Sequence, residues 1–302
     1  MRPSSPLCSE ALPGAHADRV RGVVADERGT ARPDAALPAA DGSERLRLRI
    51  QGGAAGATLI YLPGLHGDWT LIRSFRVALG GDVRFIEFTY PRTVSWSLAD
   101  YAEAVESALL EQSIRRGWLL GESFGSQVAW ALVGRAGSAF QADGIVLAGG
   151  FVRHPMPWLA GRAAGVCDGA RGGWIEAFLV LYAKYARFRH RHAPETLADI
   201  GEFVARRTDL DLRAMAQRLR LVAGSDCRGV ARASRLPVYH LAGFWDPIVA
   251  WSSVRRWLRR QCPGYRGTRI LLGADHNVLS TAPQVAAAQV REWIAPERAP
   301  GV

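Results

Sequence analysis

The stretch RGWLLGESFGSQVAWALVG, residues 116–134, decides the fold class of this chain. Its first part, GWLLGE, is an apolar run with the length of a buried strand, and its second part, from Phe124 onward, has the apolar periodicity of a helix. Between them stands Gly-Glu-Ser-Phe-Gly, the pattern that presents a nucleophilic serine on a tight strand-to-helix turn. Gly121 and Gly125 carry no side chains, so the strand and the helix can approach each other while Ser123 is held out at the end of the strand. The stretch therefore predicts that Ser123 is a nucleophile, provided that the rest of the chain supplies a base and an acid.

Strand and helix patterns alternate along the first half of the chain. Most of the strand runs are apolar throughout, which is typical of parallel strands covered by helices on both faces of a sheet. Right-handed crossovers between such strands bring their carboxyl ends to one edge of the sheet, where sites form. The predicted strands are 45–51, 57–64, 83–91, 117–122 and 143–150, and the predicted helices between them are 69–79, 97–114 and 124–136.

The alternation is interrupted half-way along the chain. Helical periodicity without any strand pattern follows, as at 174–188 and 209–224, and strand patterns return at 236–247 and 268–276. We therefore predict an α/β chain, with a mostly parallel doubly wound sheet and a helical cap inserted between two of its strands. The predicted segments are a disordered tail at 1–42, the first part of the sheet domain at 43–150, the cap at 151–235 and the second part of the sheet domain at 236–298.

A nucleophilic serine needs a base that accepts its proton, and the chain has seven histidines. His276 follows the last predicted strand, in RILLGADHNVL, at the edge where Ser123 is expected. His240 lies inside a predicted strand, and His190 and His192 lie in a basic run that is typical of a solvated surface. His276 is therefore the predicted base.

The base in turn needs a carboxylate that fixes its tautomer and stabilises its charged form. Asp246 follows a predicted strand in the sequence GFWDP, and the proline after it stiffens the loop. Asp275 is the alternative because it adjoins His276, but neighbouring side chains on a turn diverge. Asp246 is the preferred acid, and the chain order Ser-Asp-His is the one expected for a serine on this kind of turn.

Acyl transfer also needs hydrogen-bond donors for the oxyanion that forms on the substrate. The backbone N–H of Phe124, directly after the nucleophile, is one predicted donor. The loop LPGLHGDW supplies the other, because Gly64 lets the chain turn so that the Leu65 N–H faces inward. The residues predicted to line the acyl pocket are His66, Trp69, Phe151 and Trp245.

These motifs together resemble the α/β-hydrolase fold, over residues from about 45 to 298. The resemblance rests on the Pro-Gly-Leu loop, GESFG, GFWDP and GADH, and it implies the triad Ser123, Asp246 and His276. The segment LAGGFVRHPMPW is similar to a bacterial branch of this superfamily. Two positions depart from the common pattern: Pro-Gly stands where many members have His-Gly, and Ser126 stands where a second glycine is frequent.

Composition and charge exclude several other classes of protein. The formal net charge is +10, but the chain has a single lysine and many arginines among alanine and glycine, which is typical of a GC-rich genome, and no aromatic residues are interleaved with a basic run. Nucleic-acid binding is therefore not expected. No apolar run is long enough to span a membrane, and the sequence leaves the oligomeric state open.

The four cysteines, Cys8, Cys167, Cys227 and Cys262, are widely spaced and match no metal or redox motif. A disulfide framework is therefore not expected, which favours a reducing compartment and a cytoplasmic location.

The expected activity is that of a serine hydrolase that cleaves an ester or thioester through an acyl-enzyme, without a cofactor or metal. The same triad could instead pass the acyl group to another acceptor or cleave an amide. A binding protein on the same fold is the alternative from another class, since a fold does not fix a function.

Overall fold

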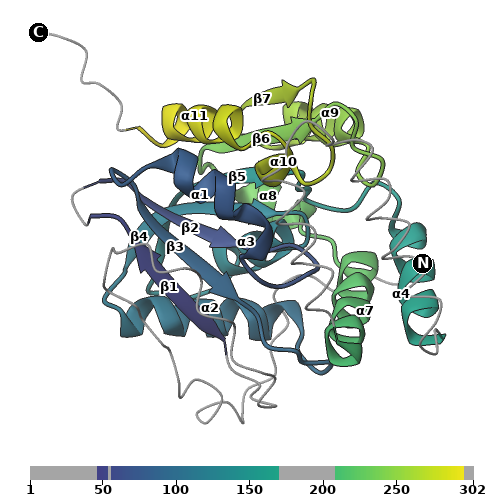
Figure 1. Ribbon diagram of the computed structural model, residues 1–302. Coiled ribbons are helices and arrows are strands. Elements are labelled where there is room, and N and C mark those ends of the chain that lie inside the picture. The colour runs from purple at the N-terminus through teal and green to yellow at the C-terminus, as the bar shows by residue number, and fades with distance from the viewer. Residues whose placement is uncertain (1–45, 54–55, 170–207, 296–302) are drawn as a thin grey trace, which may run out of the picture.

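The computed structural model describes residues 46–53, 56–169 and 208–295, and Figure 1 shows the arrangement of their helices and strands. The predicted tail at 1–42 and the predicted helix at 174–188 lie outside these ranges. The described strands form one seven-stranded sheet in the order β1-β3-β2-β4-β5-β6-β7. Its strands are β1 (Arg47–Gln51), β2 (Thr58–Leu62), β3 (Arg84–Thr89), β4 (Arg116–Glu122), β5 (Gln141–Ala148), β6 (Val238–Gly243) and β7 (Tyr265–Leu271).

The sheet is mostly parallel, as the sequence predicts. Strand β1 pairs antiparallel with β3 at one edge, and every other pair of neighbouring strands is parallel. The carboxyl ends of β2 to β7 therefore lie at one edge of the sheet, and the loops that follow them meet there.

Helices cover both faces of this sheet. One face is covered by α2 (Leu98–Glu111), α3 (Gly125–Val133), α8 (Arg228–Ala233) and α9 (Trp251–Gln261). The other face is covered by α1 (Arg73–Leu79), α10 (Val278–Thr281) and α11 (Pro283–Ile294). The run predicted as one helix at 69–79 is divided into a 3-10 turn, Thr70–Ile72, and α1.

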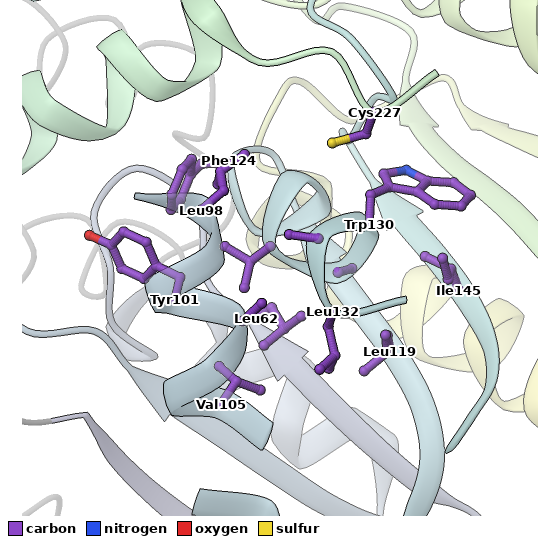
Figure 2. Packing of buried hydrophobic residues seen from close by; sticks show 14 of the residues in the cluster. Leu62, Leu98, Tyr101, Val105, Leu119, Phe124, Trp130, Leu132, Ile145 and Cys227 are labelled. Carbon is purple, nitrogen blue, oxygen red and sulfur yellow. The ribbon is translucent and has the colours of Figure 1, made fainter. Parts of the chain in front are cut away.

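Alternate residues of the central strands contribute to two separate apolar cores. Ile60 and Leu62 of β2 point into the core beneath α2 and α3, whereas Leu59 and Tyr61 point into the core beneath α1 and α11. Figure 2 shows part of the first core, where Leu62, Leu119 and Ile145 of the sheet lie close to side chains of α2 and α3. Both faces of the strands are thus buried, which explains why the strand runs are apolar throughout rather than alternating.

The segment between β5 and β6 contains α4 (Pro157–Gly169), α7 (Asp209–Gly224) and α8. Its described residues form no strand, as predicted. Helix α7 begins where the sequence places it because Thr208 and Asp211 form a capping box: the Thr208 side chain accepts from the Asp211 N–H, and the Asp211 carboxylate accepts from the Thr208 N–H. Helices α4 and α7 pack side by side, away from the sheet (Figure 1).

Two of the four cysteines have a defined state in the structure. Cys227 is disulfide-bonded, whereas Cys262 is a free, buried thiol. A single bonded cysteine is not a disulfide framework, so the expectation that the chain lacks such a framework stays a prediction.

Candidate active site

Ser123 lies directly after β4, between the strand and helix α3. Its φ angle is +49°, in the left-handed region that a serine rarely adopts. Its backbone N–H donates to the carbonyl of Ala148, at the end of the neighbouring strand β5, with an N···O distance of 3.0 Å. The turn is thus strained and tied to the sheet, and it places the side chain at the carboxyl edge.

The glycines on either side of Ser123 stand where no side chain fits. A Cβ atom on Gly125 would lie 2.0 Å from the carbonyl oxygen of Leu62, and one on Gly121 would lie 2.7 Å from the Cα atom of Ser126. These approaches are the physical reason for the Gly-x-Ser-x-Gly spacing that the sequence displays.

The hydroxyl of Ser126 connects two parts of the site. The Oγ atom lies 2.6 Å from the carbonyl oxygen of Ser123, and it accepts a hydrogen bond from the N–H of Phe151 at 3.0 Å. The serine therefore joins the turn at Ser123 to the loop after β5.

His276 follows β7 and lies between Ser123 and Asp246. Its Nε2 atom is 2.9 Å from the Ser123 Oγ, and its Nδ1 atom is 2.8 Å from the Asp246 Oδ2. Burial alone would lower the pKa of His276, but the Asp246 carboxylate, with smaller contributions from Glu122 and Asp275, raises it above the usual value for histidine.

Asp246 is fixed by its own loop. Its Oδ1 atom accepts hydrogen bonds from the N–H groups of Ile248 and Val249, both at 2.8 Å, which leaves Oδ2 for His276. The carboxylate of Asp275, the alternative acid, instead accepts from the backbone N–H of Asn277 at 3.0 Å. The structure thus brings Asp246, rather than Asp275, to the Nδ1 atom of His276.

The loop after β2 forms a tight turn beside Ser123. The Gly67 N–H donates to the Gly64 carbonyl at 3.0 Å, so that Leu65 and His66 occupy the two central positions of the turn. The side chain of Phe124, directly after Ser123, is fully buried at the start of α3 (Figure 2). Of the two predicted oxyanion donors, Leu65 is thus held in a hydrogen-bonded turn and Phe124 is held by its buried side chain.

The four residues predicted to line the acyl pocket have different surroundings. The His66 Nε2 atom lies 3.8 Å from a carboxylate oxygen of Glu122, next to Ser123, and Phe151 is buried against Ser126 and His154. The Trp69 ring instead lies under the guanidinium of Arg49 and packs against the core beneath α1. The Trp245 side chain is 59% exposed and contacts Phe244.

Glu122 is a buried carboxylate that sequence reasoning did not single out. Its Oε2 atom accepts from the Tyr61 hydroxyl at 2.5 Å, and its Oε1 atom is buried with no hydrogen-bond partner among the described residues. Burial and the Glu122 charge raise the pKa of Tyr61 well above its usual value, so the phenol stays a donor. A charged residue at the end of an otherwise apolar strand was the signal that could have identified it.

His154, in the loop after β5, is a second residue that sequence reasoning missed. Its Nδ1 atom accepts from the Met156 N–H at 3.1 Å, and its ring contacts Phe151 edge to face. Burial lowers the pKa of His154, and the nearby His276 lowers it further, so the ring is neutral at pH 7.

The described residues contain neither a metal-binding cluster nor a membrane-spanning helix. Within 46–53, 56–169 and 208–295, no group of three or more His, Cys, Asp or Glu side chains has the arrangement of a metal site. In the same part of the chain, no helix is both long and apolar enough to cross a membrane.

The fold is that of known α/β hydrolases. An α/β-hydrolase enzyme from a Medee basin deep-sea metagenome has a TM-score of 0.69 at 12% identity, covering 85% of this chain and 96% of its own. An enol-lactonase from Burkholderia xenovorans has a TM-score of 0.68 at 19% identity, covering 82% and 96%. A thermophilic esterase from Thermogutta terrifontis has a TM-score of 0.64 at 18% identity, covering 82% and 92%. The chain therefore has the α/β-hydrolase fold, with the sheet and flanking helices predicted from the sequence.

Sequence comparison is less informative. No protein-family model matches the chain, and no curated protein matches it. The likeness to the solved structures is thus one of fold, at identities too low to carry over a substrate.

Proposed function

We propose that this chain is a serine hydrolase that cleaves a carboxylic ester or thioester through an acyl-enzyme on Ser123. The observation that carries the proposal is the line of contacts from the Ser123 Oγ to the His276 Nε2, and from the His276 Nδ1 to the Asp246 Oδ2, at 2.9 Å and 2.8 Å. Both distances are within hydrogen-bond reach, as proton transfer requires.

The first half of the reaction forms the acyl-enzyme. The Ser123 Oγ attacks the substrate carbonyl carbon while His276 accepts the hydroxyl proton, and Asp246 stabilises the resulting imidazolium. The N–H groups of Leu65 and Phe124 donate to the oxyanion. The imidazolium then gives its proton to the leaving alcohol or thiol as the bond between the acyl group and its leaving atom breaks.

In the second half, water takes the place of the leaving group. His276 accepts a proton from the water, the hydroxide attacks the acyl-enzyme carbonyl, and Ser123 leaves with the proton that His276 returns. The products are a carboxylic acid and the free enzyme, so the cycle balances without a redox partner.

Esters and lactones are the first acyl substrates to test. One is named as an esterase and another as an enol-lactonase, and both ester and lactone hydrolysis break a bond between an acyl carbon and oxygen. Amide hydrolysis and acyl transfer would use the same first half, and they differ in the leaving group or in the acceptor of the acyl group.

A fluorophosphonate probe and a series of p-nitrophenyl esters of increasing acyl length test the proposal. We expect the probe to label the wild-type chain and not the Ser123→Ala variant, and we expect ester turnover to fall in that variant by on the order of 10⁶-fold. Ser252→Ala, on the exposed side of α9, is the matched control, because it removes an exposed hydroxyl and leaves the nucleophile.

A folded wild-type chain that is neither labelled nor active on any ester or thioester of the series would instead support a binding protein on this fold. Labelling with turnover only in the presence of an amine or alcohol acceptor would support an acyltransferase.

The partner that we propose is thus a small acyl ester or thioester, and not a nucleic acid. A cytoplasmic location remains a prediction.

A further inference from the structure

Arg218 is a buried arginine on α7 that the triad does not explain. Only 2% of the residue is exposed. Its Nη1 donates to the carbonyl of Leu65 at 2.7 Å, its Nη2 donates to the carbonyl of Pro91 at 2.9 Å, and its Nε donates to the hydroxyl of Tyr101 at 3.3 Å. One side chain thus connects α7 to the loops after β2 and β3, both at the carboxyl edge of the sheet.

All three of these acceptors are uncharged. Burying a guanidinium against neutral oxygens costs more free energy than leaving it in water, because the charge loses hydration without gaining an opposite charge. An apolar residue would serve better if the only purpose were to pack α7 against the sheet. The arrangement therefore points to a role that needs either the charge or the directed N–H groups of arginine.

The contacts of Arg218 lead to both residues that carry the proposed oxyanion donors. It bonds directly to the carbonyl of Leu65. It also lies 5.6 Å from the centre of the Tyr90 ring and bonds to Tyr101, and both rings pack edge to face against Phe124, at 6.0 Å and 5.4 Å. The two donor residues are thus joined through one side chain.

Gly67 lies against this guanidinium and leaves room for it because it has no side chain. Its φ angle is +79°, and a Cβ atom there would lie 2.4 Å from the Arg218 Nη1. Its N–H closes the turn that contains Leu65, and its carbonyl accepts from the Tyr90 N–H at 2.7 Å. The guanidinium therefore occupies the space that a side chain at position 67 would need, and any such side chain would displace Arg218.

We propose that Arg218 is a positioning residue that holds Leu65 and Phe124 where their N–H groups can bind the oxyanion. The proposal rests on the proposed function of Ser123. Donors stabilise a developing charge only when they are already in place, and small displacements are costly in rate. The fixed positive charge of Arg218, close to the same turn, adds to the stabilisation of the negative oxyanion.

Arg218→Met tests the proposal, with Arg213→Met as the matched control on the exposed side of the same helix. Active sites are first counted by end-point titration with the fluorophosphonate probe, so that misfolded protein does not enter the rate. We expect Arg218→Met to lower kcat per active site by on the order of 10²-fold with a much smaller change in KM, because the interaction is made in the transition state. A trifluoromethyl ketone, which forms a tetrahedral adduct, should bind more weakly by a similar factor.

Gly67→Ala provides a second test that leaves Arg218 in the chain. Its methyl group should push the guanidinium away and reproduce the fall in kcat. Gly137→Ala is the matched control, because Gly137 also has a positive φ, +72°, but no atom lies within 4 Å of a Cβ built there. Both changes strain the backbone, and only the first reaches Arg218.

Hydrogen–deuterium exchange gives a readout that does not depend on activity. Peptides that contain Leu65 should exchange faster in Arg218→Met than in wild type or Arg213→Met. Unchanged exchange, or an unchanged kcat per active site in an active enzyme, would overturn the positioning role. A wild-type chain that does not react with the probe would overturn the proposed function instead, and the exchange data would still decide whether Arg218 anchors the turn.

Discussion

The hydroxyl oxygen of Ser126 lies 2.6 Å from the carbonyl oxygen of Ser123, and the same hydroxyl accepts the N–H of Phe151. The residue that departs from the common glycine is therefore part of the framework of the turn. It ties the strained backbone of Ser123 to the loop after β5, which a glycine at this position could not do.

We expect Ser126→Ala to destabilise the chain without removing its activity. The change leaves the buried N–H of Phe151 without this acceptor, which typically costs about 1 to 3 kcal/mol in the free energy of unfolding. Urea denaturation measures the loss, and Ser252→Ala, on the exposed side of α9, is the control. A variant as stable as the control would show that the hydroxyl does not hold the turn.

The two aspartates near His276 should differ sharply in their effect on turnover. Asp246→Asn keeps an acceptor for the N–H groups of Ile248 and Val249 but removes the charge beside the His276 Nδ1, and we expect kcat to fall by on the order of 10⁴-fold. Asp275→Asn keeps an acceptor for the Asn277 N–H and should change kcat far less. Steady-state kinetics on one ester compare kcat for the two variants. A larger fall in kcat for Asp275→Asn than for Asp246→Asn would show that Asp246 is not the acid.

The sequence was sufficient to predict the sheet and the residues that meet at its edge. Parallel strands place the carboxyl ends of β4, β6 and β7 at the same edge of the sheet. The residues in the loops after them, Ser123, Asp246 and His276, could therefore be predicted to meet on topology alone. Side chains that reach the site from elsewhere could not be predicted in this way. In the sequence, Arg218 cannot be distinguished from the other charged residues of an amphipathic helix. It is buried only because α7 packs against the loops at the sheet edge.

The pocket predictions show a similar limit. Trp69 ends the loop LPGLHGDW and is predicted to line the pocket, but its ring packs beneath Arg49 against the core beneath α1. The position of a residue in a loop fixes which edge of the sheet it is near, and not the direction of its side chain.

Glu122→Gln should shift the pH dependence of catalysis. His276 accepts a proton only when neutral, so kcat/KM rises with pH through the His276 pKa. The Glu122 charge raises that pKa, and its removal should therefore move the acid limb of the profile to lower pH. The profile of kcat/KM against pH for Glu122→Gln is compared with the profiles of wild type and of Glu111→Gln, an exposed control at the end of α2. A limb that stays in place or moves to higher pH would contradict this coupling.

His240 should make the fold sensitive to acid. It lies in the middle of β6, fully buried, with its Nδ1 atom 3.3 Å from the Thr268 Oγ1. Burial lowers its pKa to about 4, helped by Arg255 and opposed by Asp246, whereas an unfolded histidine titrates near pH 6.5. Above pH 6.5 the residue is neutral in both states, and below that pH the unfolded state binds a proton that the folded state does not. The free energy of unfolding therefore falls as the pH drops from about 6.5 to about 4, by roughly 3 kcal/mol in total from this residue.

The variant His240→Asn tests this linkage separately from its effect on packing. Asparagine keeps a polar group near Thr268 but cannot be protonated, so the loss of stability between pH 7 and pH 4.5 should be smaller than in wild type by roughly 2 to 3 kcal/mol, whatever the variant's stability at pH 7. Thr268→Val is the control, because it removes the partner of the ring and leaves His240 to titrate; it should lower stability while keeping most of the acid sensitivity. Denaturant unfolding at the two pH values gives the four free energies needed for each comparison with wild type. An acid-induced loss in His240→Asn equal to that of wild type would place the acid sensitivity in other groups.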